Sequence, residues 1–127
     1  MDDLLIIALI GTGGGLGSIA RYVATIVIQH YAGAAYPWGT FVVNASGSLL
    51  IGGVFGLGEG GALSSDAVTV LAAGVLGGYT TFSTFSLENL RMLQTGRSTW
   101  MLVNAVAQVL VSLSAVGAGY WLMQVIV

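Results

Sequence analysis

The stretch Gly74-Val75-Leu76-Gly77-Gly78-Tyr79-Thr80-Thr81-Phe82-Ser83-Thr84-Phe85-Ser86 decides the fold of this 127-residue chain. It lies inside a hydrophobic run long enough to cross a membrane, yet it carries three threonines and two serines. A Gly-Gly pair followed by two β-branched threonines is unfavourable in a helix interior, so we predict that the helix breaks here. A break within a bilayer is tolerated only where protein or a water-filled cavity surrounds the freed backbone groups. The stretch is therefore a candidate ion or substrate site.

The composition indicates an integral membrane protein. Hydrophobic residues make up 56% of the chain, charged residues 6%, and the mean hydropathy is +0.93, whereas soluble domains carry about 25% charged residues. The net charge is −2 and the chain has no lysine, so nucleic-acid binding has no electrostatic support. The absence of cysteine excludes disulfides and thiolate metal sites. His30 is the single histidine, which leaves neither a zinc site nor a catalytic triad, and we do not expect an enzyme.

Four apolar segments are each long enough for a transmembrane helix. They lie at about residues 4–28, 38–57, 67–92 and 100–127. Their apolar runs are continuous rather than alternating, which favours helices over a β-barrel. Asp2 and Asp3 have the wrong charge for a signal peptide, so the first segment is interpreted as a retained span. The sequence thus predicts an all-α membrane protein with a single transmembrane domain over residues 1–127 and antiparallel neighbouring helices.

The charged residues are weakly biased between the two membrane faces. The arginines fall toward the face with the first and third loops and the acids toward the other: Arg21, Arg91 and Arg97 against Asp2, Asp3, Glu59 and Asp66. Taken simply, the positive-inside rule places both termini outside. With so few loop charges, however, insertion in both directions is open. Four helices enclose little aqueous space, so we expect a homo-oligomer, in its simplest form an antiparallel, dual-topology homodimer.

Polar residues form rows at helical spacing on two further segments. The rows are Thr40, Asn44 and Ser48 on the second segment and Asn104, Gln108 and Ser112 on the fourth. The Asn44 amide offers two donors to an anion, although an interhelical hydrogen bond is the ordinary alternative. Two donor-rich rows beside a broken helix together indicate an ion pathway.

Aromatic and charged residues near the break are further candidates. Phe82 and Phe85 are three residues apart and share a face if the helix resumes after the break. The edge of an aromatic ring is positive, so these rings are able to coordinate an anion, with plain packing as the alternative. Arg21 is either an attracting charge near a vestibule or a structural anchor that extends toward the interface. Glu88 is a vestibule or structural carboxylate.

Three motifs resemble those of the Fluc (CrcB) family of fluoride channels. Residues 14–22 resemble its GGxxGAxxRY opening, with Ser18 in place of the usual alanine. Residues 38–44 resemble its GTLxVN element, and residues 74–86 resemble its GxxGGxTTFSTF element. The motifs occur in the expected order, and the resemblance covers essentially the whole chain.

The resemblance implies a fluoride-selective channel that exports fluoride passively across the inner (cytoplasmic) membrane and reduces fluoride toxicity. It implies an antiparallel homodimer with two pores and a central structural sodium ion, held by the backbone carbonyls of Gly77 and Thr80 from both subunits. The implied pore residues are Asn44, Phe82, Phe85, Ser83, Thr84 and Ser112. Gln108 and Asn104 are not placed by any motif.

Two other functions remain open from the residues. A proton-coupled small multidrug-type transporter is also small and often of dual topology, but it uses a carboxylate in the first helix. The first segment has none, which leaves Glu88 as the candidate. A non-transporting membrane scaffold is the other alternative.

Overall fold

The structure is a computed structural model that describes residues 2–126, and the chain is helical with short links. The elements are α1 (Asp3–Ala32), α2 (Trp38–Glu59), α3 (Ser65–Thr69), the π-helix η1 (Val70–Leu76), α4 (Gly77–Tyr79), α5 (Phe82–Gln94) and α6 (Ser98–Ile126). Together they give four spans long and apolar enough to cross a membrane, the third being the composite Ser65–Gln94. The predicted all-helical fold with four spans is confirmed.

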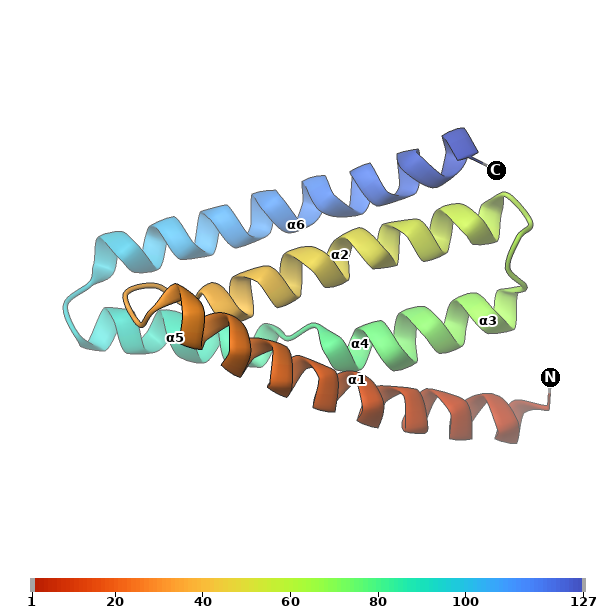
Figure 1. Ribbon diagram of the computed structural model, residues 1–127, viewed down its shortest axis with the longest axis horizontal. Helices are drawn as coiled ribbons and strands as arrows, with labels where there is room; N and C mark the ends of the chain where they lie inside the picture. The colour runs from red at the N-terminus through yellow and green to blue at the C-terminus, as the bar shows by residue number, and fades with distance from the viewer. Residues whose placement is uncertain (1, 127) are drawn as a thin grey trace.

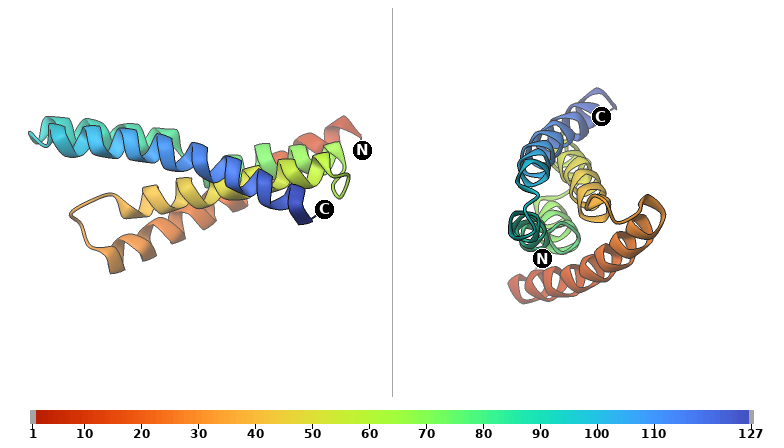
Figure 2. Two further views of the ribbon diagram at one scale, coloured as in Figure 1. Left: turned by 90° about the horizontal axis from the view of Figure 1, so that it is seen from above. Right: turned by 90° about the vertical axis from the view of Figure 1, so that its left-hand side faces the viewer.

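Consecutive spans run in opposite directions (Figure 1). Both termini and the α2–α3 link lie at one end of the molecule, and the α1–α2 and α5–α6 links lie at the other. α6 packs mainly on α2, whereas α1 packs mainly on η1 and also contacts α2 and α4. The views in Figure 2 show the same order, with α1 and α6 on opposite sides of the bundle. The broken third span therefore packs against both α1 and α2, which also contact each other.

Glycines allow the helix backbones to approach one another closely. A Cβ added at Gly17 would overlap the carbonyl oxygen of Val75 where α1 crosses η1. A Cβ added at Gly52 would overlap the carbonyl oxygen of Val116 where α2 meets α6. Both glycines are buried. Small residues at such crossings provide the close packing that holds membrane helices together.

The first helix is longer than its apolar segment. α1 continues past the predicted end near Ile28 to Ala32 and stops at Gly33, whose φ is 82°. The Gln29 side chain donates to the carbonyls of Gly33 and Tyr36, so polar residues complete the helix end and the following link. The apolar residues identify the part of a helix that suits lipid, whereas the backbone hydrogen bonds of the helix continue beyond that part.

The third span breaks where the sequence predicts. α4 ends at Tyr79, and Thr80 and Thr81 are extended, with ψ of 161° and 124°. α5 begins at Phe82, and the Thr81 hydroxyl accepts from Thr84 N at 3.2 Å as its N-cap. A helix with a capped N-terminus thus follows the break directly, and its first turn is not frayed.

Candidate functional site

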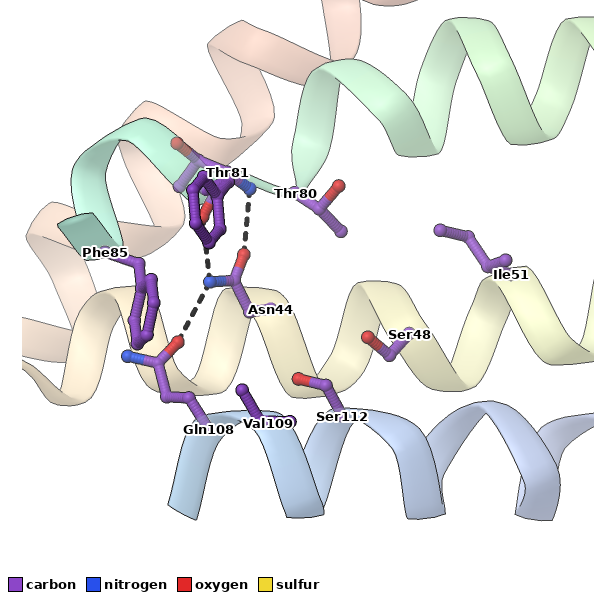
Figure 3. A pocket seen from close by; sticks show the side chains of 10 residues that line it. Asn44, Ser48, Ile51, Thr80, Thr81, Phe85, Gln108, Val109 and Ser112 are labelled. Atoms are coloured by element: carbon purple, nitrogen blue, oxygen red, sulfur yellow. Dashed lines mark hydrogen bonds between the residues drawn. The ribbon is translucent and has the colours of Figure 1, made fainter. Parts of the chain in front are cut away.

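The Asn44 side chain satisfies the backbone at the break. Thr81 N donates to Asn44 Oδ1 at 2.8 Å, and Asn44 Nδ2 donates to Thr81 O at 3.0 Å (Figure 3). In a continuous α-helix the Thr81 N–H would instead bond to the Gly77 carbonyl, four residues earlier. The Asn44 side chain on α2 therefore replaces the hydrogen-bond partner that Thr81 would have in a continuous helix.

The second N–H of Asn44 is also in use within the chain. Nδ2 donates to Gln108 Oε1 at 2.9 Å, which joins α2 to α6. The two N–H groups of Asn44, which we expected to bind an anion, thus both donate to acceptors within the subunit. Asn44 makes the interhelical hydrogen bond that was the alternative. An anion would bind Asn44 by replacing one of these acceptors.

A groove of about 280 Å³ runs along this cluster. Its lining residues come from α2, the break, α5 and α6: Asn44, Ser48, Ile51, Thr80, Thr81, Phe82, Phe85, Gln108, Val109 and Ser112. Phe82 and Phe85 share a face of α5 as predicted, with ring centroids 5.6 Å apart. Phe82 is 78% exposed in the single chain.

Ser83 and Thr84 have a different place from the other pore candidates. Neither lines the groove. Both belong to the cap of α5: the Thr81 hydroxyl lies 3.2 Å from Ser83 Oγ and donates to Thr84 Oγ1 at 3.1 Å. Their hydroxyls organise the restart of the helix beside the groove.

Arg21 and Ser18 connect α1 to the carbonyls at the break. Arg21 Nη1 donates to Thr80 O at 3.4 Å, and Ser18 Oγ donates to Gly78 O at 3.3 Å. Arg21 therefore lies level with the break, not at a helix end. This hydrogen bond places the positive charge of Arg21 beside the break.

Glu88 lies on α5, three residues after Phe85, and contacts α2. Thr40 Oγ1 donates to Glu88 Oε1 at 2.6 Å, and Thr40 is 1% exposed. The other oxygen, Oε2, is buried and has no hydrogen-bond partner among residues 2–126. A second hollow, of about 440 Å³, lies here and is also lined by Arg91 and Arg97. Tyr36 lies in the α1–α2 link. Its own burial raises the pKa of its hydroxyl, and the negative charge of Glu88 raises this pKa further.

Three amides continue the hydrogen bonding of Asn44 across α6 to α5. Gln108 Nε2 donates to Asn104 Oδ1 at 3.1 Å, and Asn104 Nδ2 donates to Asn89 Oδ1 at 2.9 Å. Asn104 is 0% and Gln108 5% exposed. The sequence pattern identified the row on α6 but not Asn89. An asparagine one residue after a carboxylate in an apolar span was the signal available for it.

The oxygens near the break that could hold a cation include backbone carbonyls of the unwound segment. Among residues 2–126, no group of three or more His, Asp or Glu side chains is placed to hold a metal. The Gly77 carbonyl has lost its helical donor because Thr81 N bonds to Asn44, and Gly77 is exposed. Unwound carbonyls of this kind coordinate Na⁺ in membrane transporters, so the donor set fits an alkali cation.

Comparison with known proteins agrees with the motifs. The family described as "CrcB-like protein, Camphor Resistance (CrcB)" matches residues 8–120. A protein of Rhizobium meliloti (strain 1021) named "Fluoride-specific ion channel FluC" is 46% identical over 123 residues, which cover 95% of this chain and 98% of the relative. A protein of the same name from Thermus thermophilus is 44% identical over 120 residues, or 94% of each chain. "Fluoride-specific ion channel FluC 1" of Streptomyces avermitilis is 39% identical over 124 residues, covering 98% of this chain and 97% of the relative. The chain, a multi-pass membrane protein, therefore belongs to the CrcB-like family.

Proposed function

We propose that this protein is a fluoride-selective channel that lets fluoride leave the cell passively across the inner membrane and so reduces fluoride toxicity. The observation that carries the proposal is the groove at the helix break, where an amide, hydroxyls and two phenylalanine rings lie together. The relatives' names state fluoride-specific ion channels, a non-enzymatic function. Fluoride is strongly hydrated, so its path must replace water with donors and positive ring edges.

The pore proposal assigns roles to residues from four helices. Asn44 supplies an amide donor, Phe82 and Phe85 supply ring edges, and Ser112 supplies a hydroxyl on α6. Ser83 and Thr84 act at the cap that begins α5. Arg21 holds a positive charge at this level, and Glu88 occupies the neighbouring hollow. A pore formed from this donor-lined groove would exclude the larger chloride ion by its size and lining.

The assembly proposed is an antiparallel, dual-topology homodimer with two pores where the subunits meet. The exposure of Phe82 supports a partner chain, since a second subunit would cover a ring that is 78% exposed in one. The groove is open along one side of the single chain and would become a closed path only with a second wall. This arrangement is tested by crosslinking in membranes and by the mass of the purified protein in detergent.

A structural sodium ion between the subunits completes the proposal. The carbonyls of Gly77 and Thr80 would hold it, and its charge would offset part of the cost of bringing an anion into the membrane. Thr80 O accepts a long 3.4 Å hydrogen bond from Arg21, which leaves this oxygen able to take another partner. If sodium has this role, its replacement by choline weakens the dimer in detergent; an unchanged dimer would remove the ion from the proposal.

The deciding experiment is passive anion efflux from liposomes that contain only the purified protein. Fluoride and chloride release are measured with ion-selective electrodes in the same preparation. Fast fluoride release with negligible chloride release supports the channel. Folded protein that releases neither ion refutes it and favours a scaffold.

The proton-coupled transporter predicts a different dependence. Transport would then need a pH gradient and a titratable carboxylate, for which Glu88 is the candidate. A Glu88→Gln variant that loses proton-driven efflux of a cationic drug would support the transporter. Fluoride release without any pH gradient supports the channel.

A further inference from the structure

Four side-chain amides from three helices form one continuous hydrogen-bonded chain. From the break it runs Asn44, Gln108, Asn104 and Asn89, with donor–acceptor distances of 2.9, 3.1 and 2.9 Å. We refer to these four residues as the amide chain. Its middle members are almost completely buried, so each unpaired amide group would carry a substantial free-energy cost.

The break determines which way every amide points. Thr81 offers an N–H and a C=O to the same side chain, so Asn44 must direct Oδ1 to the N–H and Nδ2 to the carbonyl. The remaining N–H of Asn44 then requires an oxygen from Gln108. Gln108 is left with its nitrogen toward Asn104, and Asn104 with its nitrogen toward Asn89. The backbone of one residue thus orders all four amides.

The amide chain also attaches α5 to the other helices at a second point. Asn89 lies seven residues after Phe82, which corresponds to about 10 Å along the helix. One end of α5 is fixed at Thr81 through Asn44, and this second point is fixed through Asn104 on α6. Phe85 lies between the two fixed points. Two attachments define the direction of a helix, whereas one leaves it free to tilt.

We propose that Asn104 and Asn89 are positioning residues of the pore, which hold Gln108 against Asn44 and fix the direction of α5 and its phenylalanine rings. This inference rests on the proposed fluoride channel and concerns the residues that the family motifs leave without a role. The inference gives each amide a defined hydrogen-bonding role. Asn89 needs only to accept a hydrogen bond, whereas Asn104 must both accept and donate one.

The direction of the amide chain provides a matched pair of variants. Asn89→Asp keeps an acceptor oxygen for Asn104 Nδ2, and Asn89→Leu removes it. Asn104→Leu interrupts the chain at its buried centre. Gln124→Leu is the control for an amide-to-leucine change on α6, because Gln124 is exposed and its side chain has no hydrogen bond to any other described residue.

The first measurement is NMR of the side-chain NH₂ groups in protein labelled with ¹⁵N-asparagine and ¹⁵N-glutamine. We expect the Asn44 and Gln108 signals to shift or broaden in Asn104→Leu and Asn89→Leu, and to stay in place in Asn89→Asp and Gln124→Leu. Unchanged Asn44 and Gln108 signals in folded Asn104→Leu and Asn89→Leu would overturn the proposal, whatever the flux does.

The second measurement is fluoride efflux from liposomes for the same proteins. Loss of one buried hydrogen bond predicts about tenfold slower release in Asn89→Leu, with rescue by Asn89→Asp to within about twofold of the unmodified protein. Equal release by the Leu and Asp variants would overturn the positioning role. If the unmodified protein itself releases no fluoride, the channel proposal fails, while the NMR signals still decide whether the amide chain orders Asn44.

Discussion

Replacement of Asn44 by leucine tests whether a side chain from α2 holds the helix break together. Leucine has a similar size but removes three hydrogen bonds at once: one from Thr81 N, one to Thr81 O and one to Gln108 Oε1. Thr81 is 7% and Gln108 5% exposed, so water has little access to replace the lost partner.

The expected loss of stability follows from these three bonds. Polar contacts between membrane helices average about 0.6 kcal/mol each, which gives a lower value of about 2 kcal/mol. Typical intramolecular hydrogen bonds reach about 1.5 kcal/mol each, which gives an upper value of about 5 kcal/mol. We therefore expect Asn44→Leu to lower the free energy of unfolding by about 2–5 kcal/mol.

The assay is reversible unfolding in mixed micelles, followed by far-UV circular dichroism. Ser112→Ala is the matched control, because Ser112 lines the same groove and its side chain has no hydrogen bond to any other described residue. It should change the stability by less than about 0.5 kcal/mol, as substitutions that break no buried interaction do. If Asn44→Leu costs no more than Ser112→Ala, then the amide does not support the break and the reasoning is wrong.

Three further changes give separate tests of the pore and the packing. Phe82→Ile should reduce fluoride flux by removing a ring edge while leaving the helical content unchanged, because Phe82 is 78% exposed in the subunit; unchanged efflux from liposomes would count against the ring-edge role. Asn44→Asp keeps the acceptor for Thr81 N but places a carboxylate where an anion passes. At about 4 Å and an effective dielectric constant of about 20, repulsion of about 4 kcal/mol predicts roughly 1,000-fold slower flux, and normal flux in the efflux assay would contradict the donor role. Gly52→Ala should destabilise the fold by about 1–3 kcal/mol because its Cβ would overlap a carbonyl oxygen of α6. Gly117→Ala on α6 meets no atom within 4 Å, so thermal unfolding should show it as neutral or slightly stabilising, and equal effects of the two changes would refute the packing argument.

Local rules, meaning the residue types along each segment, were sufficient to predict the spans and the break. Continuous apolar runs located four helices, and glycines before β-branched threonines located the interruption at Thr80 and Thr81. Local rules did not predict the π-helical turn of Val70–Leu76, which depends on how the span packs against α1. Nor did they predict the end of α1, because Gln29 stabilises it by contacts with the following link.

The site was predictable as a set of residue types and less so as a set of partners. Helical spacing placed Asn44 and the row of Asn104, Gln108 and Ser112 on single faces. It did not reveal that Asn44 would be fully engaged by Thr81 and Gln108, because that depends on how α2 and α6 are positioned relative to the break. Asn89 has no spacing relation to the other amides, so only the folded chain brings it to them.

The interruption in the third span has an electrical consequence. Peptide dipoles align along a helix, so the carbonyl end at Tyr79 carries roughly half a negative elementary charge, and the amide end at Phe82 carries roughly half a positive one. These ends are separated by only two residues. The backbone of one interruption therefore presents a field that attracts cations and a field that attracts anions, side by side, in addition to the charge of Arg21. The backbone of an unbroken helix of the same length would present neither field at this depth.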